Sequence, residues 1–258
     1  MRFDVITLFP ELFEPFLQVG VTRRAYASKQ VQVELWPLRQ FTHDNYQRVD
    51  DRPFGGGPGM VMLAQPLREA IEAVRQARGD AAPVVLFSPQ GQTLHHGVVQ
   101  QWADSSGAIL LCGRYEGIDQ RLIDSMVDVQ LSLGDFVLSG GEIAALALLD
   151  AVTRLQPGVL GDADSHAQDS FNPALDGLLD CPHYTRPEVW AGPEGEMAVP
   201  EVLLSGHHGR IAAYRRAQSL HATAKARPDV LAQARQAGLI KPADEALLRT
   251  LPPTPQAD

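Results

Sequence analysis

Three short apolar runs in the middle of the chain each lead directly into a turn rich in glycine or serine. The runs are 83–87, 108–112 and 127–133, and the turns are 88–91, 113–117 and 134–141. Apolar runs of this length between turn residues are typical of buried strands in a mostly parallel sheet. Because ligands of such sheets bind beyond the carboxyl ends of the strands, we predict an α/β fold with a nucleoside-binding site built from these three loops.

Further strands and a series of helices surround the three runs. Residues 2–8 and 30–36 favour strands, and Pro10 opens a helix after the first of them. Apolar residues recur at helical spacing in the ranges 66–78, 95–103, 118–126, 142–155, 207–220, 228–237 and 242–251. Residues 43–59 have no apolar period, and a long irregular loop of this kind is usually functional.

A change of composition divides the chain into two parts. Glycine, aspartate, serine and asparagine are frequent between residues 157 and 180, which is typical of a linker. We therefore predict a first domain over residues 1–158, an interdomain linker over 159–180, and a smaller, mainly helical domain over 181–258. We expect its last residues, 252–258, to be disordered.

Composition and charge narrow the class of protein. The 258 residues are 45% hydrophobic, and neither the start of the chain nor the apolar run 143–149 is long enough for a signal peptide or a membrane span. We expect a cytoplasmic protein. The net charge of −9 argues by itself against a nucleic-acid binder. However, residues 206–238 contain six arginines and lysines and Asp229 as the only carboxylate, so this stretch is either an RNA-binding surface or a solvated helix face.

Several short motifs have an ordinary structural explanation when they are taken singly. Residues 55–59 are glycine-rich, but no Gly-Lys-Ser/Thr follows, so we expect a mobile loop rather than a phosphate loop. Cys181 and His183 lack a second ligand pair at metal-binding spacing, and we expect both cysteines of the chain to be buried thiols. Spacing alone favours Asp169 as a capping residue and Arg154 as a cation at a helix C-terminus.

Taken together and in order, the motifs carry a resemblance. They are Asp50-Asp51-Arg52-Pro53-Phe54-Gly55-Gly56-Gly57-Pro58-Gly59-Met60, Ser88-Pro89-Gln90-Gly91, Cys112-Gly113-Arg114-Tyr115-Glu116-Gly117-Ile118-Asp119, Gly134-Asp135-Phe136-Val137-Leu138-Ser139-Gly140-Gly141-Glu142, Asp169-Ser170-Phe171 and Gly177-Leu178-Leu179-Asp180-Cys181-Pro182-His183-Tyr184-Thr185-Arg186-Pro187. The chain resembles the bacterial tRNA (guanine-N1)-methyltransferases of the SPOUT superfamily, which modify guanosine 37 of tRNA. The resemblance extends from Arg2 to about Asp229.

The resemblance implies a fold, a cofactor and partners that spacing does not reveal. The fold would contain a deep trefoil knot formed around the three turns, a topology that is rare among proteins. The cofactor would be S-adenosylmethionine, with Mg²⁺ beside Glu116 as a further candidate. The enzyme would be a homodimer with shared active sites, and its substrate would be the anticodon stem-loop of a tRNA with guanosine at positions 36 and 37.

The resemblance also implies roles for individual residues. Asp169 would be the general base that removes the proton from guanine N1, and Arg154 would stabilise the negative charge on guanine O6. The cofactor would be bound by Ser88, Pro89, Gly113, Tyr115, Glu116, Gly117, Leu133, Gly134, Asp135, Phe136, Val137, Leu138, Gly140 and Gly141. The tRNA would be bound by Asp50, Ser165, Ser170, Asp180 and Arg215.

Two alternatives remain open from the sequence. One is a methyltransferase of the same fold that acts on rRNA or on a ribose 2′-oxygen. The motifs that contain Asp169 and Asp180 argue against it, because they lie outside the knot that such enzymes share. The other is a non-catalytic RNA-binding or cofactor-sensing protein, which would be expected to have lost Asp169 or Arg154, and both are present.

Overall fold

The structure is a computed structural model that describes residues 1–161 and 166–249. It divides into two compact units, Met1–Gly161 and Asp162–Asp258. The predicted disordered tail, 252–258, lies outside the described residues. In the part of the chain that the structure describes, every helix is too short or too polar to cross a membrane.

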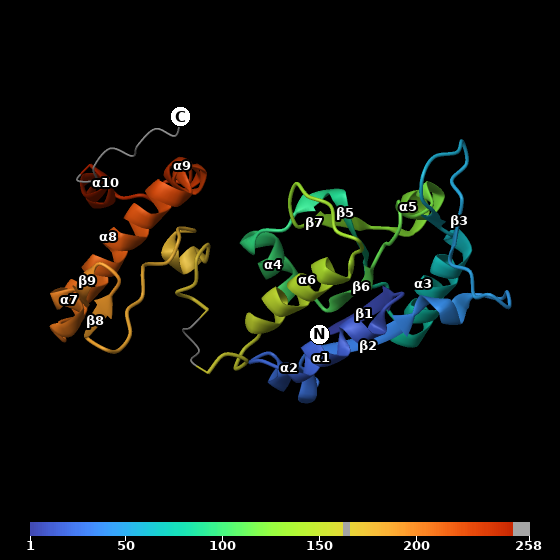
Figure 1. Ribbon diagram of the computed structural model, residues 1–258, viewed down its shortest axis with the longest axis horizontal. Helices are drawn as coiled ribbons and strands as arrows, with labels where there is room; N and C mark the ends of the chain where they lie inside the picture. Colours follow the sequence, from blue (N-terminus) through green and yellow to red (C-terminus); the bar gives the residue numbers. More distant parts are fainter. Residues whose placement is uncertain (162–165, 250–258) are drawn as a thin grey trace. The chain divides into compact units, whose positions relative to one another are not determined.

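The first unit is built on a five-stranded sheet in which every neighbouring pair of strands is parallel (Figure 1). The strand order is β2 (Gln32–Pro37), β1 (Arg2–Thr7), β6 (Gly107–Leu111), β5 (Val84–Thr93) and β7 (Val129–Ser132). This confirms the predicted α/β class and the mostly parallel sheet. The strands β5, β6 and β7 are the three apolar runs on which that prediction was based.

Helices cover both faces of this sheet, which explains why β6 and the first residues of β5 are continuously apolar rather than alternating. Val85 and Leu110 pack into one buried cluster and the adjacent Leu86 and Leu111 into another. The first cluster includes residues of α4 (His96–Ala103) and α6 (Glu142–Arg154), with side chains of the short helices α1 (Glu14–Gln18) and α2 (Arg23–Ala27). The second includes residues of α3 (Ala64–Arg78) and α5 (Gln120–Met126).

The structure differs from the sequence prediction near the first helix. The predicted single helix is a 3₁₀ turn, Pro10–Leu12, followed by α1. The physical reason is Pro15, which has no N–H to donate to the carbonyl of Glu11, so one continuous α-helix from Pro10 would lose a hydrogen bond. The helix α2 was not predicted.

A second difference concerns the first of the three glycine- or serine-rich turns. The prediction placed a turn after the strand, but residues Ser88–Gly91 lie within β5. Phe87 and Gln92 both align with Leu131 of β7, so the intervening residues bulge out of the ladder. The strand then continues to Thr93, and Leu94 N donates to Ser132 O at 2.7 Å. The residues predicted as the first turn therefore form a wide bulge, and β7 pairs with the residues on both sides of it.

The irregular segment 43–59 is partly ordered by a small hairpin. The strand β3 (Asp50–Asp51) pairs with β4 (Val61–Met62), and a 3₁₀ turn, Leu38–Phe41, precedes the segment. The glycine-rich part between the strands remains irregular, and Phe54 within it is fully exposed.

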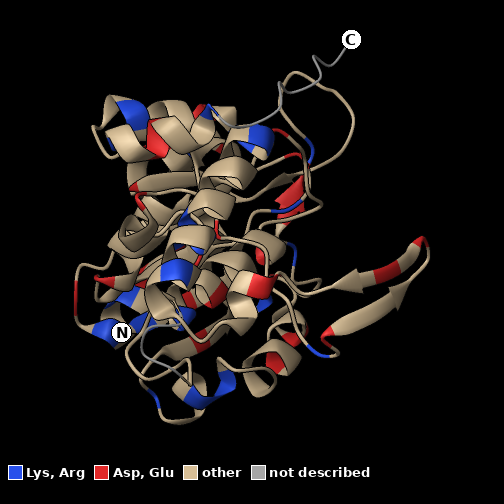
Figure 2. Ribbon diagram, turned by 90° about the vertical axis from the view of Figure 1, so that its left-hand side faces the viewer, with Lys and Arg blue, Asp and Glu red and all other residues tan. Residues whose placement is uncertain are grey.

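The second unit combines a hairpin with a set of helices. Its elements are β8 (Val189–Gly192), β9 (Gly195–Ala198), α7 (Glu201–Leu204), α8 (His208–Ala226), α9 (Pro228–Gln236) and α10 (Pro242–Leu248). The hairpin and α7 were not predicted, and α8 is longer than predicted. The helix α8 carries only basic charges, from Arg210, Arg215, Arg216 and Lys225. Figure 2 colours the lysines and arginines of the chain blue and its aspartates and glutamates red.

The segment 166–180 belongs to the second unit, although the sequence analysis placed it in a linker. It contains a 3₁₀ turn, Pro173–Leu175, capped by the Asn172 side chain. Leu178 is fully buried and forms the core of the unit with Leu220, Leu231 and Ala234. The difference arises because one apolar side chain in a polar stretch finds a buried site on α8, and local composition does not reveal that contact.

Candidate active site

The bulge within β5 and the loops that follow β6 and β7 line one cavity of about 440 Å³. Because neighbouring parallel strands end at the same edge of the sheet, the bulge Ser88–Gly91, the segment 113–118 and the segment 133–141 come together there. The lining includes four glycines and three serines, together with Ala144 of α6 and Ile123 of α5. The position agrees with the site predicted at the carboxyl ends of the strands.

Two glycines allow these segments to pack backbone against backbone. A Cβ atom on Gly91 would lie 2.5 Å from the backbone of Gln130 and Leu131. A Cβ atom on Gly141 would lie 2.9 Å from the Cα of Cys112, and Gly141 N donates to Gly113 O at 2.9 Å. Side chains at either position would push the loops apart, so these glycines are required by close approach rather than by an unusual φ.

The predicted cofactor residues are brought together in this cavity. All of them except Gly134 and Asp135 line it, and whether they bind a cofactor stays a prediction. Gly134 lies beneath Phe136, whose ring would be 3.1 Å from a Cβ atom there. Further lining residues that the sequence analysis missed are Leu86, Phe87, Gln90, Arg114, Ile118, Gln120, Ile123, Gln130, Leu131, Ser132, Ser139 and Ala144.

Arg114 is the most informative of the missed residues, because it ties two of the loops together. Its Nε lies 2.9 Å from Oε2 of Glu142, whose side chain is almost fully buried at the start of α6. Its guanidinium also donates to the carbonyl of Ser139 at 3.3 Å and lies 4.4 Å from the centroid of the Phe9 ring. The remaining Glu142 oxygen accepts a hydrogen bond from Thr7 Oγ1 at 2.9 Å.

The buried charge of Glu142 is therefore compensated from several sides. A helix N-terminus stabilises a carboxylate, and Arg114 supplies the opposite charge. Both residues lie within motifs that the sequence analysis quoted, but spacing could not show that they meet. The pair fixes the rim of the cavity and presents a cation to it.

The hairpin β3–β4 is fastened to the second loop of the cavity. Glu116 N donates to Met60 O at 3.0 Å, and Met62 N donates to Gly117 O at 2.9 Å. Tyr115 has a φ of 61°, in the left-handed region. Burial and then the nearby Asp50 carboxylate raise the pKa of the Tyr115 hydroxyl, whereas Arg39 opposes the shift. Asp50, predicted to contact tRNA, thus lies beside a residue that lines the cavity.

The two predicted catalytic residues belong to different units. Arg154 is the last residue of α6, in the first unit. Asp169 lies half-buried in the second unit, in a turn where its N–H donates to His166 O and its carbonyl accepts from Asn172 N, both at 3.2 Å. Their meeting at one site therefore stays a prediction.

Three other predicted tRNA-binding residues, Ser170, Asp180 and Arg215, lie in the second unit. Ser170 Oγ accepts a hydrogen bond from Asp180 N at 2.9 Å. Arg215 is exposed on α8, and its charge lowers the pKa of the Cys181 thiol, although burial and Asp180 raise that pKa more strongly. Ser165 lies outside the described residues.

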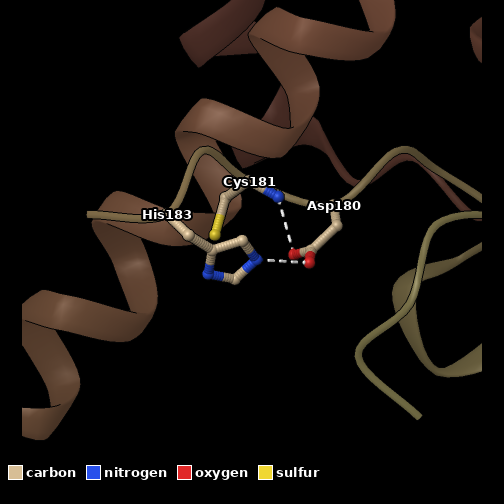
Figure 3. Close-up of side chains that lie close together, drawn as sticks. All are labelled: Asp180, Cys181 and His183. Atoms are coloured by element: carbon tan, nitrogen blue, oxygen red, sulfur yellow. Dashed lines mark hydrogen bonds and ion pairs between the residues drawn. The ribbon is translucent and has the colours of Figure 1, made fainter. Parts of the chain in front are cut away.

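One group of side chains in the described residues could hold a metal ion. Asp180, Cys181 and His183 place a carboxylate oxygen, a sulfur and an imidazole nitrogen within 4.8 Å of one another (Figure 3). No such group of three includes Glu116 within residues 1–161 and 166–249. Both cysteines are buried thiols, as predicted.

Comparisons with known proteins agree on one family. Residues 1–233 match the family described as tRNA (Guanine-1)-methyltransferase TrmD. The chain is 64% identical over 248 residues to the tRNA (guanine-N(1)-)-methyltransferase of Albidiferax ferrireducens, covering 96% of this chain and 98% of that protein. It is 64% identical over 255 residues to the protein of the same name from Paracidovorax citrulli, covering 97% and 98%. The corresponding values for the protein from Bordetella pertussis are 55% over 255 residues, covering 97% and 98%.

Proposed function

The chain belongs to the tRNA (guanine-1)-methyltransferase family, and from this premise we propose that it transfers the methyl group of S-adenosylmethionine to N1 of guanosine 37 in tRNAs that carry guanosine at position 36. The observation that carries the proposal is the cavity at the carboxyl ends of β5, β6 and β7. Its volume of about 440 Å³ lies in the range of small-molecule sites, and its lining of loop backbone offers donors and acceptors for the polar edge of an adenine.

The residues of the cavity fit such a cofactor. Phe136 and Leu138 supply apolar surface for an adenine ring, and both are partly exposed toward solvent. Gly113 and Gly140 also line the cavity and are half-buried, with the side chains of Ile118 and Arg114 beside them. S-adenosylmethionine would supply a methyl group that is already activated by a positively charged sulfur.

The protein then has two tasks at the guanine, which are to remove the N1 proton and to stabilise the resulting charge. Asp169 accepts the N1 proton, but a carboxylate is a weak base for this step. Arg154 compensates by donating hydrogen bonds to guanine O6, where the negative charge builds up. A guanidinium stays protonated and presents a planar fork, which suits this role.

The tRNA is recognised mainly through the second unit. Asp180 accepts hydrogen bonds from the N–H groups of a guanine edge, and Ser165 and Ser170 contact the neighbouring nucleotide. Arg215 and the other basic residues of α8 bind phosphates of the anticodon stem-loop, with Asp50 contacting the target base from the first unit. The helix α8 carries no acidic residue, which supports its proposed role in binding phosphates.

A knotted dimer would bring Arg154 and Asp169 together. We extend the proposal to a trefoil knot around the three loops and to a homodimer in which each active site takes Asp169 from the partner subunit. The exposed side chains of Phe136, Val137 and Ile143 beside the cavity support an interface there. To test it, Asp169→Ala and Arg154→Ala are co-expressed with different tags, and the mixed dimer is isolated. Recovery of activity over either variant alone supports shared sites, and no recovery refutes them.

The function itself is tested with tRNA transcripts that carry guanosine or adenosine at position 37. The purified protein is incubated with S-adenosylmethionine and each transcript, and the methylated nucleotide is located by mass spectrometry after digestion. We expect N1-methylguanosine at position 37 of the first transcript alone. Methylation of rRNA or of a ribose oxygen instead would refute the proposal. Calorimetry with S-adenosylhomocysteine tests the cofactor site separately, and activity with and without a chelator tests the Mg²⁺ prediction.

A further inference from the structure

The segment that follows Leu178 is held rigidly on α8 before it reaches the group Asp180, Cys181 and His183. Two hydrogen bonds fix the backbone of Leu179. Its N–H donates to Thr223 Oγ1 at 3.0 Å, and its carbonyl accepts from Ser219 Oγ. The backbone of Asp180 is fixed in turn by Ser170. The three side chains therefore start from an anchored main chain.

The three side chains face one another. Oδ2 of Asp180 lies 2.7 Å from Nε2 of His183, and Oδ1 accepts a hydrogen bond from Cys181 N at 2.7 Å. Figure 3 shows the carboxylate and the imidazole ring facing each other, with the sulfur of Cys181 beside the ring. All three candidate ligand atoms lie within 4.8 Å of one another.

The mixture of ligand types selects the kind of cation. Mg²⁺ and Ca²⁺ prefer oxygen alone, whereas Zn²⁺ accepts carboxylate oxygen, imidazole nitrogen and thiolate sulfur in a tetrahedron with metal–ligand distances of roughly 2.0–2.3 Å. Such distances separate the ligands by roughly 3–4 Å. Here Oδ2 and Nε2 are 2.7 Å apart and all three atoms lie within 4.8 Å of one another. The exposed ring of His183 has the freedom to make the small outward shift that replaces its hydrogen bond with a metal bond.

We propose that Oδ2 of Asp180, Sγ of Cys181 and Nε2 of His183 bind one Zn²⁺ ion, with solvent at the fourth position. Sequence spacing did not predict this site, because Cys181 and His183 lack a second ligand pair elsewhere in the chain. The third ligand is the adjacent residue Asp180. Cys181 binds Zn²⁺ as a thiolate, so its proton is released on binding.

The site has a consequence that rests on the proposed function. Asp180 cannot hold the cation through Oδ2 and at the same time offer that oxygen to a guanine.

The test uses Co²⁺ as a coloured substitute for Zn²⁺, with the full-length protein, no affinity tag and a reductant without thiols. We expect a thiolate-to-cobalt absorption band in the near ultraviolet that disappears when Zn²⁺ is added. Cys181→Ser should lose this band, and His183→Ala should weaken Zn²⁺ binding by about 10-fold or more. Cys112→Ala and His208→Ala are the matched controls, since these residues lie outside the group, and both should retain the band.

The proposal is overturned if the wild-type protein gives no such band or if Cys181→Ser retains it. A measurement on the wild-type protein alone covers the case in which a variant does not fold. Bound Zn²⁺ should slow the alkylation of Cys181, as followed by mass spectrometry, and an unchanged rate contradicts the site. Because neither measurement involves tRNA or methyl transfer, their failure leaves the methyltransferase proposal standing.

Discussion

The two units of this protein are stabilised in different ways. The first contains two large apolar clusters, one on each face of a parallel sheet. Phe3 and Leu148 are fully buried in one of them and Ile71 in the other. In the second, as far as the structure describes it, the core cluster consists of four buried apolar residues. This unit relies in addition on polar contacts, among them the two hydrogen bonds from Arg216 to Asp244.

This difference matches the tasks that we propose for the two units. A cavity built from loop backbone needs a rigid frame, and a doubly covered sheet provides it. A surface that reads RNA needs polar and basic side chains, which leaves fewer positions for an apolar core. Substitutions in the second unit should therefore impair recognition and chemistry while leaving cofactor binding intact.

The largest expected effect tests that separation directly. Asp169→Ala should reduce methyl transfer about 100- to 10,000-fold, the usual contribution of a general base. The affinity for S-adenosylhomocysteine, measured by calorimetry, should stay within a few-fold because the cavity belongs to the first unit. Asp229→Asn, which removes an exposed carboxylate of the same unit, is the control. Activity of Asp169→Ala near that of the wild type would show that another group is the base.

The corresponding change in the first unit is Arg154→Ala. We expect kcat to fall about 100- to 1,000-fold with little change in KM, since the guanidinium acts on charge that develops only in the transition state. Arg68→Ala, which removes an exposed arginine of α3, should leave both constants unchanged. An effect confined to KM would place Arg154 in ground-state binding of the tRNA instead.

The two cores are compared by truncating one fully buried leucine in each. Leu178→Ala and Leu148→Ala should each cost about 2–5 kcal/mol of unfolding free energy. Hydrogen exchange resolved by peptide should localise each loss to its own unit, and the second unit should open at lower denaturant because its core is smaller. Leu204→Ala, at a half-exposed position, is the control. Equal loss of protection in both units would mean that they unfold as one.

The smallest expected effect concerns the polar contacts of the second unit. Hydrogen bonds from Arg216 hold the pKa of Asp244 below its usual range. The stability that they contribute is therefore present above the unfolded-state pKa of about 3.9 and is lost as the pH falls through the lower folded-state value. Denaturant unfolding between about pH 5 and pH 3 should show the wild-type second unit losing about 1 kcal/mol more than Asp244→Asn. Glu196→Gln, at an exposed position of β9, should behave like the wild type. A loss in Asp244→Asn that parallels the wild type would refute this contribution.

Much of the first unit could be predicted from the sequence because its signals are local. Apolar runs bounded by turns identified β5, β6 and β7, and the position of a ligand site followed from the geometry of parallel strands. The bulge at Ser88–Gly91 could not be predicted, since it depends on both Phe87 and Gln92 pairing with Leu131. The hairpin β8–β9 was missed because its residues are mostly exposed and carry no clear alternation.

By itself, the sequence determined the α/β class, the three segments that line the cavity and the family to which the chain belongs. These features are local, because strand patterns and motifs consist of consecutive residues. Only the tertiary structure decided that Arg114 meets Glu142, that Leu178 joins the core of the second unit and that Asp180, Cys181 and His183 converge. These contacts depend on where distant backbone segments lie in space. Burial and pairing energies act on that arrangement, and no local pattern encodes it.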